Sequence, residues 1–303
     1  MKRSALLAQI QEQGVDESLL RAVEAWQGEE VHGDRIPQSH YVYDGREVWE
    51  EVLHAILGGY HLLLSGAKAS GKNVLSENLA QLFRRPMWNL SLNISSDAQE
   101  LIGQDTFVAG EVRLRKGPLA LAAEAGGFVV LDEINMAKNE SLAVIHAALD
   151  FRRIIDIPGY EKIELHPKTR IIGTMNYGYA GTRELNEALV SRFLVVDMPQ
   201  LTEESLRRIL LRETAVTEAH VDLLVRLFLD LQLKSLNGEI SSKAVDVRGL
   251  FAATDLMKGG LAPRPALEMG LVNKSFDPYE KELITDIIES LLPPGTEGGF
   301  FFQ

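Results

Sequence analysis

The chain has 303 residues, 46% of them hydrophobic, and its formal net charge is −12. This length predicts two domains, or one large domain with an appendage, and the apolar content is sufficient for a buried core. The acidic balance argues against a dedicated nucleic-acid-binding protein. Cysteine is absent, which excludes disulfides and thiolate catalysis, and no apolar stretch approaches the roughly 20 residues of a membrane span. We therefore expect a cytoplasmic protein with no membrane association.

Short apolar runs alternate with amphipathic helical patterns along the first two thirds of the chain. This alternation indicates a mostly parallel sheet covered by helices on both faces. The first 45 residues predict a helical lead-in, and we interpret their amphipathic start as a helix and not as a signal peptide. We predict strands at 61–65, 87–92, 128–131, 170–174 and 194–196, helices at 47–57, 73–83 and 119–125, and a further helix face marked by Leu142, Ile145 and Leu149.

Strand signals disappear from about Leu201 onward. Residues 203–293 predict helices, with a loop rich in glycine and proline near residues 259–265. The C-terminal tail combines turn residues with three phenylalanines that we expect to be exposed. The chain therefore divides into a helical N-terminal extension (1–45), an α/β core (46–200) and a helical C-terminal domain with its tail (201–303).

The first strand is followed by a glycine loop, GAKASGKN, at Gly66–Asn73. It matches the phosphate-binding pattern G-x-x-x-x-G-K-[ST] at every position but the last, and a strand before it and a helix after it complete the context. Glycines let backbone N–H groups surround phosphate oxygens, and the helix N-terminus adds a favourable dipole. The alternative, a tight turn with a solvated lysine, is disfavoured by this context. We predict ATP contacts from Gly66, Ala67, Lys68, Ala69, Ser70, Gly71, Lys72 and Asn73, with Lys72 reaching the β- and γ-phosphates.

Asn73 is the departure from the pattern. The usual serine or threonine offers a hydroxyl to Mg²⁺, whereas asparagine offers an amide oxygen with a different reach. Nucleotide binding is therefore a firmer prediction than the geometry of the metal, and the sequence does not say whether Asn73 slows hydrolysis.

Two carboxylates and an amide follow the next strands. Asp132 and Glu133 come directly after Phe128–Leu131, with Asp132 60 residues beyond Lys72 (132 minus 72). We predict that Asp132 holds Mg²⁺, directly or through water, and that Glu133 orients and deprotonates the attacking water. Asn176, in TMNYG, is predicted to position that water, and its alternative interpretation is an ordinary turn residue.

Three arginines are candidates for contacts with the γ-phosphate. Arg192, in LVSRF, is predicted to end a helix carrying Leu185 and Leu189 on one face and to act on the nucleotide of a neighbouring subunit as an arginine finger. Arg183 is its rival for that role. Arg248 is predicted to start a helix of the C-terminal domain and to touch the phosphates of its own subunit, and its alternative is a solvated arginine at a helix end.

Together these residues resemble the MoxR-like branch of AAA+ ATPases. That branch includes relatives acting with cobaltochelatase, Rubisco and nitric-oxide reductase, and the midasin-like proteins. The resemblance covers about residues 45–255. Its marks are GAKASGKN, ELIGQ (Glu100–Gln104), KGPLALAAEAGGFVVLDEIN (Lys116–Asn135), GTMNYG and REL-x-x-AL-x-x-RF (Arg183–Phe193). Two further stretches, Leu101–Pro118 and Arg152–Lys168, match a helix-2 insert and a hairpin that are typical of this branch and are thought to face a partner or substrate.

The resemblance implies an AAA+ P-loop α/β core with a five-stranded parallel sheet, followed by a small all-helical lid domain. It also implies ATP and Mg²⁺ as cofactors and a ring, usually hexameric, with nucleotide between subunits. The implied role is chaperone-like remodelling of a protein client, often with a partner that carries a von Willebrand A domain. The client and the pathway do not follow from the sequence.

A ring-forming ATPase that remodels a protein partner is therefore the first hypothesis. The second is a nucleotide-gated binding module with little hydrolysis, because Asn73 alters the metal site. A third is a DNA-directed AAA+ motor with five cations along a pore, which the net charge of −12 disfavours, and a small-molecule kinase is a distant fourth. The five cations are Arg113, Arg115, Lys116, Arg152 and Arg153.

Overall fold

The computed structural model describes residues 1–26, 32–176, 184–292 and 295–303. The chain divides into two compact units. The first, called the core unit, comprises Met1–Ala67 and Gly71–Pro199, and the second, called the C-terminal unit, comprises Lys68–Ser70 and Gln200–Gln303. None of the helices in the described ranges is long and apolar enough to cross a membrane.

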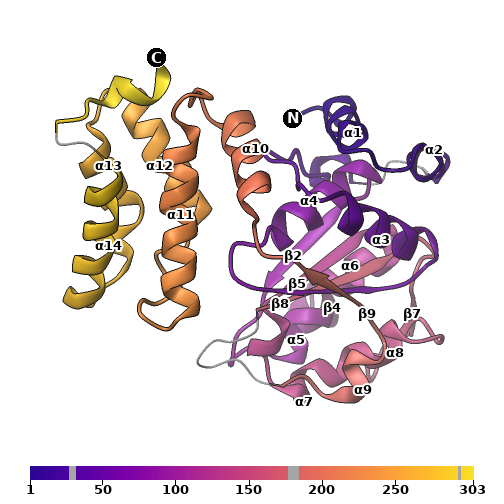
Figure 1. Cartoon of the computed structure of the whole chain (residues 1–303). Coiled ribbons are helices and arrows are strands. Elements are labelled where there is room, and N and C mark those ends of the chain that lie inside the picture. The colour runs from indigo at the N-terminus through magenta and orange to yellow at the C-terminus, as the bar shows by residue number, and fades with distance from the viewer. Residues whose placement is uncertain (27–31, 177–183, 293–294) are drawn as a thin grey trace. The chain divides into compact units, whose positions relative to one another are not determined.

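Five parallel strands form the central sheet of the core unit, in the order β2-β5-β8-β1-β9 (Figure 1). All five were predicted, because each is a short apolar run bounded by loop residues. The predicted α/β fold with a five-stranded parallel sheet is therefore confirmed. The strands are β1 (Leu62–Gly66), β2 (Met87–Ser91), β5 (Phe128–Asp132), β8 (Arg170–Asn176) and β9 (Leu194–Met198).

The central strands β1, β5 and β8 are largely buried on both faces of the sheet, and successive residues of each strand point to opposite sides. In β1, Leu62 and Leu64 belong to one hydrophobic cluster with residues of α3 and α4, whereas Leu63 belongs to a second cluster with residues of α6. All three leucines are fully buried. Burial on both faces explains why the central strands β1 and β5 each contain an apolar run of three or four residues. The covering helices are α3 (Arg46–Leu57), α4 (Lys72–Leu82) and α6 (Pro118–Ala125).

Two antiparallel hairpins are inserted into the core unit, at the two places where the resemblance implies inserts. The first follows α5 (Ala98–Ile102) and pairs β3 (Gly103–Val108) with β4 (Glu111–Lys116). The second, immediately before β8, pairs β6 (Ile154–Ile155) with β7 (Ile163–Glu164).

The segment between β5 and β6 differs from the continuous helix face predicted from Leu142, Ile145 and Leu149. The three side chains are buried, but the backbone alternates between α-helical and 3₁₀ turns. Apolar residues three and four apart fit both kinds of turn, so their spacing does not reveal the interruption. The elements are η2 (Ile134–Met136), α7 (Asn139–Leu142), η3 (Ala143–Ile145), α8 (His146–Leu149) and, before β9, α9 (Glu187–Val190).

The N-terminal residues pack onto α4, the helix that follows the phosphate loop. Asn78 of α4 is fully buried; its Oδ1 accepts the Tyr43 N–H at 2.8 Å, and its Nδ2 donates to the Tyr41 carbonyl at 2.8 Å. Leu6 and Ile10 belong to the same hydrophobic cluster as α3 and α4. The lead-in thus shares the core of the unit and holds α4 in place. Its elements are α1 (Arg3–Glu12), α2 (Glu17–Ala25) and η1 (Gly33–Arg35).

The described C-terminal unit is helical throughout and has a hydrophobic core of its own. The expectation that the three terminal phenylalanines are exposed is wrong. Phe301 is fully buried, and Phe300 and Phe302 pack against the same core. The tail folds back because the Thr217 N–H donates to the Phe301 carbonyl at 3.0 Å. The elements are α10 (Glu203–Glu213), α11 (Val221–Leu236), α12 (Val247–Lys258), α13 (Pro263–Gly270), η4 (Val272–Lys274), α14 (Pro278–Leu291) and η5 (Gly298–Phe302).

Candidate active site

Three neighbouring strands bring the predicted site residues to one edge of the sheet. The parallel strands β1, β5 and β8 end at Gly66, Asp132 and Asn176. The register pairs Gly66 with Asn176 across β1 and β8. The carboxyl edge of a parallel sheet is where such folds place ligands. The start of the phosphate loop, the acidic pair and Asn176 therefore lie together at this edge.

Lys72 begins α4 and is turned back onto the phosphate loop. Its Nζ donates to the carbonyl oxygens of Gly66 at 3.0 Å and of Ala67 at 2.8 Å. Only 7% of the residue is exposed, and burial lowers the pKa of Lys72 to about 8, although the carboxylates of Asp132 and Glu133 act in the opposite direction. At neutral pH the lysine is mostly protonated, and it lies where a helix N-terminus would receive phosphate oxygens.

Two residues other than glycine have a left-handed backbone at this edge. The φ angle is +64° at Ala69 and +54° at Glu133, whereas Gly71 adopts its φ of +85° freely. The left-handed conformation costs an L-residue about 1–2 kcal/mol. Four further residues away from the site share this conformation, so the strain at Ala69 and Glu133 does not by itself mark the site; they are His32, Arg84, Ala109 and Arg153.

Asp132 is held by one side chain on each of its carboxylate oxygens. Nδ2 of Asn73 donates to Oδ2 at 3.2 Å, and the buried hydroxyl of Thr174 donates to Oδ1. The two predicted metal ligands, Asn73 and Asp132, are thus within hydrogen-bond distance of each other. Both carry oxygen atoms, the donors that Mg²⁺ prefers. As placed, however, the amide nitrogen of Asn73 faces the carboxylate, so an ion between the two would require the amide to turn.

Glu133 and Asn176 are fixed through their backbones. The Thr174 hydroxyl accepts the Glu133 N–H at 3.1 Å, so this one threonine contacts both members of the acidic pair. Nδ2 of the buried Asn135 donates to the Asn176 carbonyl at 2.8 Å. The Glu133 side chain itself is exposed. A polar network therefore ties the end of β5 to the end of β8 and leaves the Glu133 carboxylate accessible.

Arg192 lies at the opposite edge of the sheet from the phosphate loop. It comes two residues before β9, the outermost strand beside β1, and the register pairs Leu194 with Leu62 at the amino ends of these strands. Met198 is level with Gly66, and Leu194 comes four strand residues earlier. At about 3.3 Å per strand residue the amino end of β9 lies about 13 Å from the level of Gly66, and Arg192 precedes that end.

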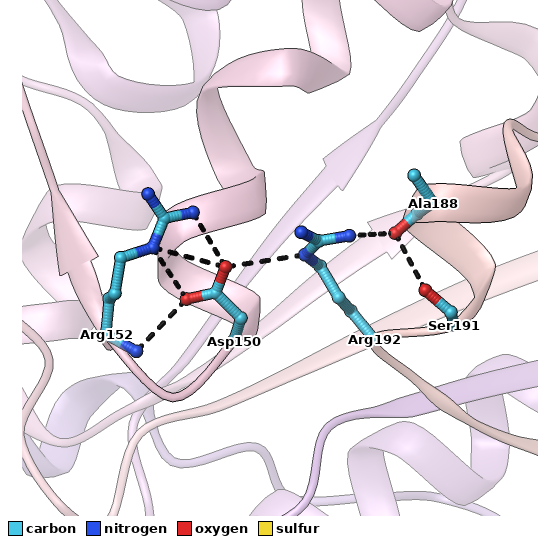
Figure 2. Close-up of polar contacts among 5 residues, drawn as sticks. All are labelled: Asp150, Arg152, Ala188, Ser191 and Arg192. Carbon is cyan, nitrogen blue, oxygen red and sulfur yellow. Dashed lines mark hydrogen bonds and ion pairs between the residues drawn. The ribbon is translucent and has the colours of Figure 1, made fainter.

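Two groups contact the Arg192 side chain, the carboxylate of Asp150 and the carbonyl of Ala188 (Figure 2). Its Nε lies 3.5 Å from Oδ2 of Asp150, and its Nη1 donates to the Ala188 carbonyl. The helix predicted to precede it is shorter than expected, because α9 begins at Glu187 and leaves Leu185 outside.

Of the two other candidate arginines, Arg248 lies within the described residues and Arg183 does not. Arg248 is the second residue of α12 in the C-terminal unit, where its N–H donates to Oδ1 of Asp246, the N-cap residue, at 3.1 Å. Its side chain is exposed, and its contact with phosphates stays a prediction. Arg183, the rival of Arg192, lies outside the described residues.

Sequence reasoning did not single out Thr174, Asn135 or Asp150. Thr174 and Asn135 lie inside motifs that were recognised, and a hydroxyl within a buried strand is a usable signal, since buried polar groups need partners. Asp150 gives no such signal, because its partner Arg192 comes 42 residues later in the chain (192 minus 150).

Comparison with known proteins now decides the family. A sequence model of the AAA domain (dynein-related subfamily) matches residues 61–193, from the start of β1 to the residue after Arg192. The chain is 34% identical over 262 residues to the uncharacterized protein YojN of Bacillus subtilis, and the match covers 84% of this chain and 86% of YojN. This chain belongs to the dynein-related subfamily of AAA proteins. The predicted AAA family, with its MoxR-like features, is confirmed.

Further proteins are similar to this chain. An uncharacterized protein of Staphylococcus haemolyticus is 29% identical over 259 residues, covering 83% of this chain and 98% of its own. Among solved structures, a protein of Cytophaga hutchinsonii assigned as an ATPase has 18% identity and a TM-score of 0.46, covering 69% of this chain and 57% of its own. A mutant of RuvB from Thermotoga maritima has 16% identity and a TM-score of 0.47, covering 70% and 63%. This chain therefore spans less than two thirds of each of these two solved structures.

Proposed function

We propose that this AAA protein binds ATP with Mg²⁺, hydrolyses it, and works as a ring that remodels a protein partner. The observation that carries the proposal is the arrangement around the sheet. Lys72, Asp132, Glu133 and Asn176 meet at the carboxyl edge, whereas Arg192 precedes the amino end of β9, which lies about 13 Å from the level of Gly66. One subunit thus holds a nearly complete hydrolytic site, and its arginine is suited to the site of a neighbour.

Lys72 is the residue that would bind the nucleotide most strongly. Its ammonium group is already held among the loop carbonyls of Gly66 and Ala67, and phosphate oxygens would replace those weaker acceptors. The backbone N–H groups around Gly71 and the first turn of α4 add donors and a favourable helix dipole. We further propose that the C-terminal unit acts as the lid, with Arg248 as its contact to the phosphates.

Magnesium fits the donor set of this site. Mg²⁺ takes oxygen ligands and keeps several waters, so Asp132 can hold the ion through water while it keeps its bond from Thr174. Asn73 can contribute its amide oxygen only after the amide turns away from its present bond to Asp132. The ion would supply charge to the β- and γ-phosphate oxygens.

Glu133 is suited to act as the general base. Its carboxylate is exposed at the sheet edge, while its backbone is fixed by Thr174. General-base catalysis requires a carboxylate within hydrogen-bond distance of the attacking water. Asn176, whose carbonyl is fixed by Asn135, would place an amide beside that water.

Exposed apolar side chains around Arg192 support assembly. Phe151, next to Asp150, is 93% exposed, and Leu194 and Val195 of the edge strand β9 are 44% and 51% exposed. Exposed hydrophobic groups beside an unpaired strand edge favour burial against another chain. A second subunit covering this surface would bring its phosphate loop towards Arg192. AAA proteins often form oligomers, and by resemblance we propose a hexamer.

The hairpin β3–β4 is our candidate for contact with the client. Phe107 is 75% exposed and Val112 is 60% exposed, although they form a facing pair. By resemblance the partner is a protein, in particular one that carries a von Willebrand A domain. The DNA motor is disfavoured further because three of its five proposed cations are already in ion pairs, namely Arg113 with Glu111, Lys116 with Glu124 and Arg152 with Asp150.

One observation favours the second candidate, a nucleotide-gated module with little hydrolysis. Asn73 donates to Asp132 with the atom that cannot bind a metal. If this bond persists when ATP is bound, the ion is held by one protein ligand fewer and turnover is slow.

Measuring ATP turnover and ATP binding in paired variants tests the proposal. Glu133→Gln is expected to keep ATP affinity and to lower turnover by about 10²-fold or more. Lys72→Ala is expected to remove detectable ATP binding in a calorimetric titration, because the charged contact to the phosphates is lost. Wild-type turnover in Glu133→Gln, or unchanged affinity in Lys72→Ala, would contradict the proposed site. Nucleotide binding without turnover in the wild type would support the gated module instead.

A further inference from the structure

The Arg192 side chain is one member of a chain of polar contacts within its own subunit (Figure 2). The carboxylate of Asp150 lies between the guanidinium groups of Arg152 and Arg192, and Arg192 also donates to the carbonyl of Ala188. Only 26% of the Arg192 side chain and 14% of the Asp150 side chain are exposed. The proposed finger is thus partly buried and directed before any neighbour arrives.

The two arginines share Asp150 unequally. Arg152 donates from Nε to Oδ1 at 3.0 Å, from Nη2 to Oδ2 at 2.7 Å and from its backbone N–H to Oδ1 at 3.0 Å. Arg192 has only the longer 3.5 Å approach of Nε to Oδ2. A two-point guanidinium–carboxylate contact fixes orientation as well as distance. Arg152 therefore holds the carboxylate firmly, and the carboxylate holds Arg192 loosely.

A side chain that is positioned but can be released needs a weak contact to a firmly held partner, and Arg192 has such a contact with Asp150. A γ-phosphate carries more negative charge than a carboxylate, so Arg192 can exchange its weak contact for a stronger one. Asp150 would not be left as an unpaired charge, because Arg152 keeps it satisfied. Positioning matters, since a misplacement of about 1 Å in a catalytic group can lower a rate by about 10²-fold.

We propose that Asp150 is a positioning residue for Arg192, fixed in turn by Arg152, and that it sets the direction from which the arginine enters the site of the adjacent subunit. The inference rests on the proposed function of Arg192. It assigns a role in catalysis to two residues outside the nucleotide-binding edge of the sheet.

Steady-state kinetics with Asp150→Asn test the inference, because asparagine keeps an oxygen for the Arg152 N–H and removes the charge. Turnover is expected to fall about 10- to 100-fold with the KM for ATP changed less than about twofold. Asp150→Glu is expected to restore part of the rate, and Arg152→Ala to give an intermediate loss. Glu239→Gln is the matched control, since Glu239 is a carboxylate paired with Lys234 in the C-terminal unit, and it should leave turnover unchanged.

The decisive comparison is made in the Arg192→Ala background. There Asp150→Asn should cause no further loss beyond about twofold, because the group that it positions is gone. An equal fold-loss in both backgrounds, or wild-type turnover in Asp150→Asn, overturns the inference. If Asp150→Asn does not fold, Arg152→Ala decides, because Arg152 is exposed and wild-type turnover in that variant contradicts the proposal.

A second readout needs no turnover. His146 of α8 has its pKa lowered by burial and then by Arg192, whereas Asp150 acts to raise it. Arg192→Ala is therefore expected to raise the pKa of His146 in an NMR titration, and an unmoved value would show that the Arg192 guanidinium is not held near His146 in solution, as the inference requires. A wild type without any turnover would refute the proposed function and this inference with it. Turnover that depends on Glu133 and Arg192 but ignores Asp150 would refute this inference alone.

Discussion

Raising the pH from 7.5 to 9.5 is expected to weaken ATP binding by roughly 25-fold, because Lys72 loses its proton in that range. Burial lowers the pKa of Lys72 to about 8. With that pKa, about 76% of the lysine is protonated at pH 7.5 and about 3% at pH 9.5. Only the protonated form carries the charge that the phosphates require. Affinity therefore falls as the pH rises, and the second pKa of a phosphate, about 6, keeps the charge of ATP constant over the window.

Isothermal titration calorimetry of the wild type with a non-hydrolysable ATP analogue measures this effect without consuming the nucleotide, and it keeps the Glu133 carboxylate, which acts on the pKa of Lys72, in place. Because bound phosphates raise the pKa of Lys72 again, ATP binding at pH 8 should take up about half a proton, which is detected by comparing buffers of different ionisation enthalpy. Adenosine is the control ligand, since it has no phosphate and its affinity should not follow the pH. A lysine with the ordinary pKa of about 10.4 would stay almost fully charged at pH 9.5. An affinity that is flat across the window would therefore refute the account of Lys72.

Three further predictions follow from single residues. Asn73→Thr is expected to preserve or raise Mg²⁺-dependent turnover, because threonine restores a hydroxyl ligand, and a folded variant without activity would show that Asn73 is an adapted ligand. Burial, with nearby arginines, lowers the pKa of His61 to about 3, so below pH 6.5 the unfolded chain binds a proton that the folded chain does not. The free energy of unfolding should therefore fall by up to about 1.4 kcal/mol for each pH unit below 6.5. Thermal melts from pH 7 to 5 that show no such fall would contradict this prediction. Asn78→Ala removes one buried and one partly buried hydrogen bond to residues of the N-terminal segment and should lower the free energy of unfolding by roughly 2–3 kcal/mol. Denaturant unfolding measures this, and a loss below about 0.5 kcal/mol would show that these bonds do not stabilise the contact between α4 and that segment.

The strands and the phosphate loop could be predicted because their signals are local. A buried strand such as β5 needs a short run of apolar residues, and the loop at Gly66–Asn73 needs glycines and a lysine at fixed spacing. The edge shared by Asp132 and Asn176 then follows from the parallel topology alone. Local chemistry thus predicted most of the residues that lie together at the carboxyl edge of the sheet.

Contacts between distant residues could not be predicted in the same way. Asn78 bonds to residues 35 and 37 positions earlier in the chain, and Asp150, directly after α8, pairs with Arg192, which follows α9. A single polar residue has no periodicity, so nothing in its neighbourhood reveals such a partner. The prediction that the terminal phenylalanines are exposed was wrong for a related reason. The burial of Phe301 depends on where the tail packs in the fold and not on the sequence around it.

The central claim is that two subunits together complete each hydrolytic site. Mixing two inactive variants tests this claim most directly. Arg192→Ala subunits should bind ATP almost normally and turn it over slowly, because an arginine finger is worth about 10³–10⁵ in rate where measured. Lys72→Ala subunits cannot bind ATP but still carry Arg192. Rings containing both should therefore recover part of the wild-type turnover, in proportion to the mixed interfaces. Rings shown to be mixed that remain inactive, or wild-type turnover by a proven monomer, would contradict the account.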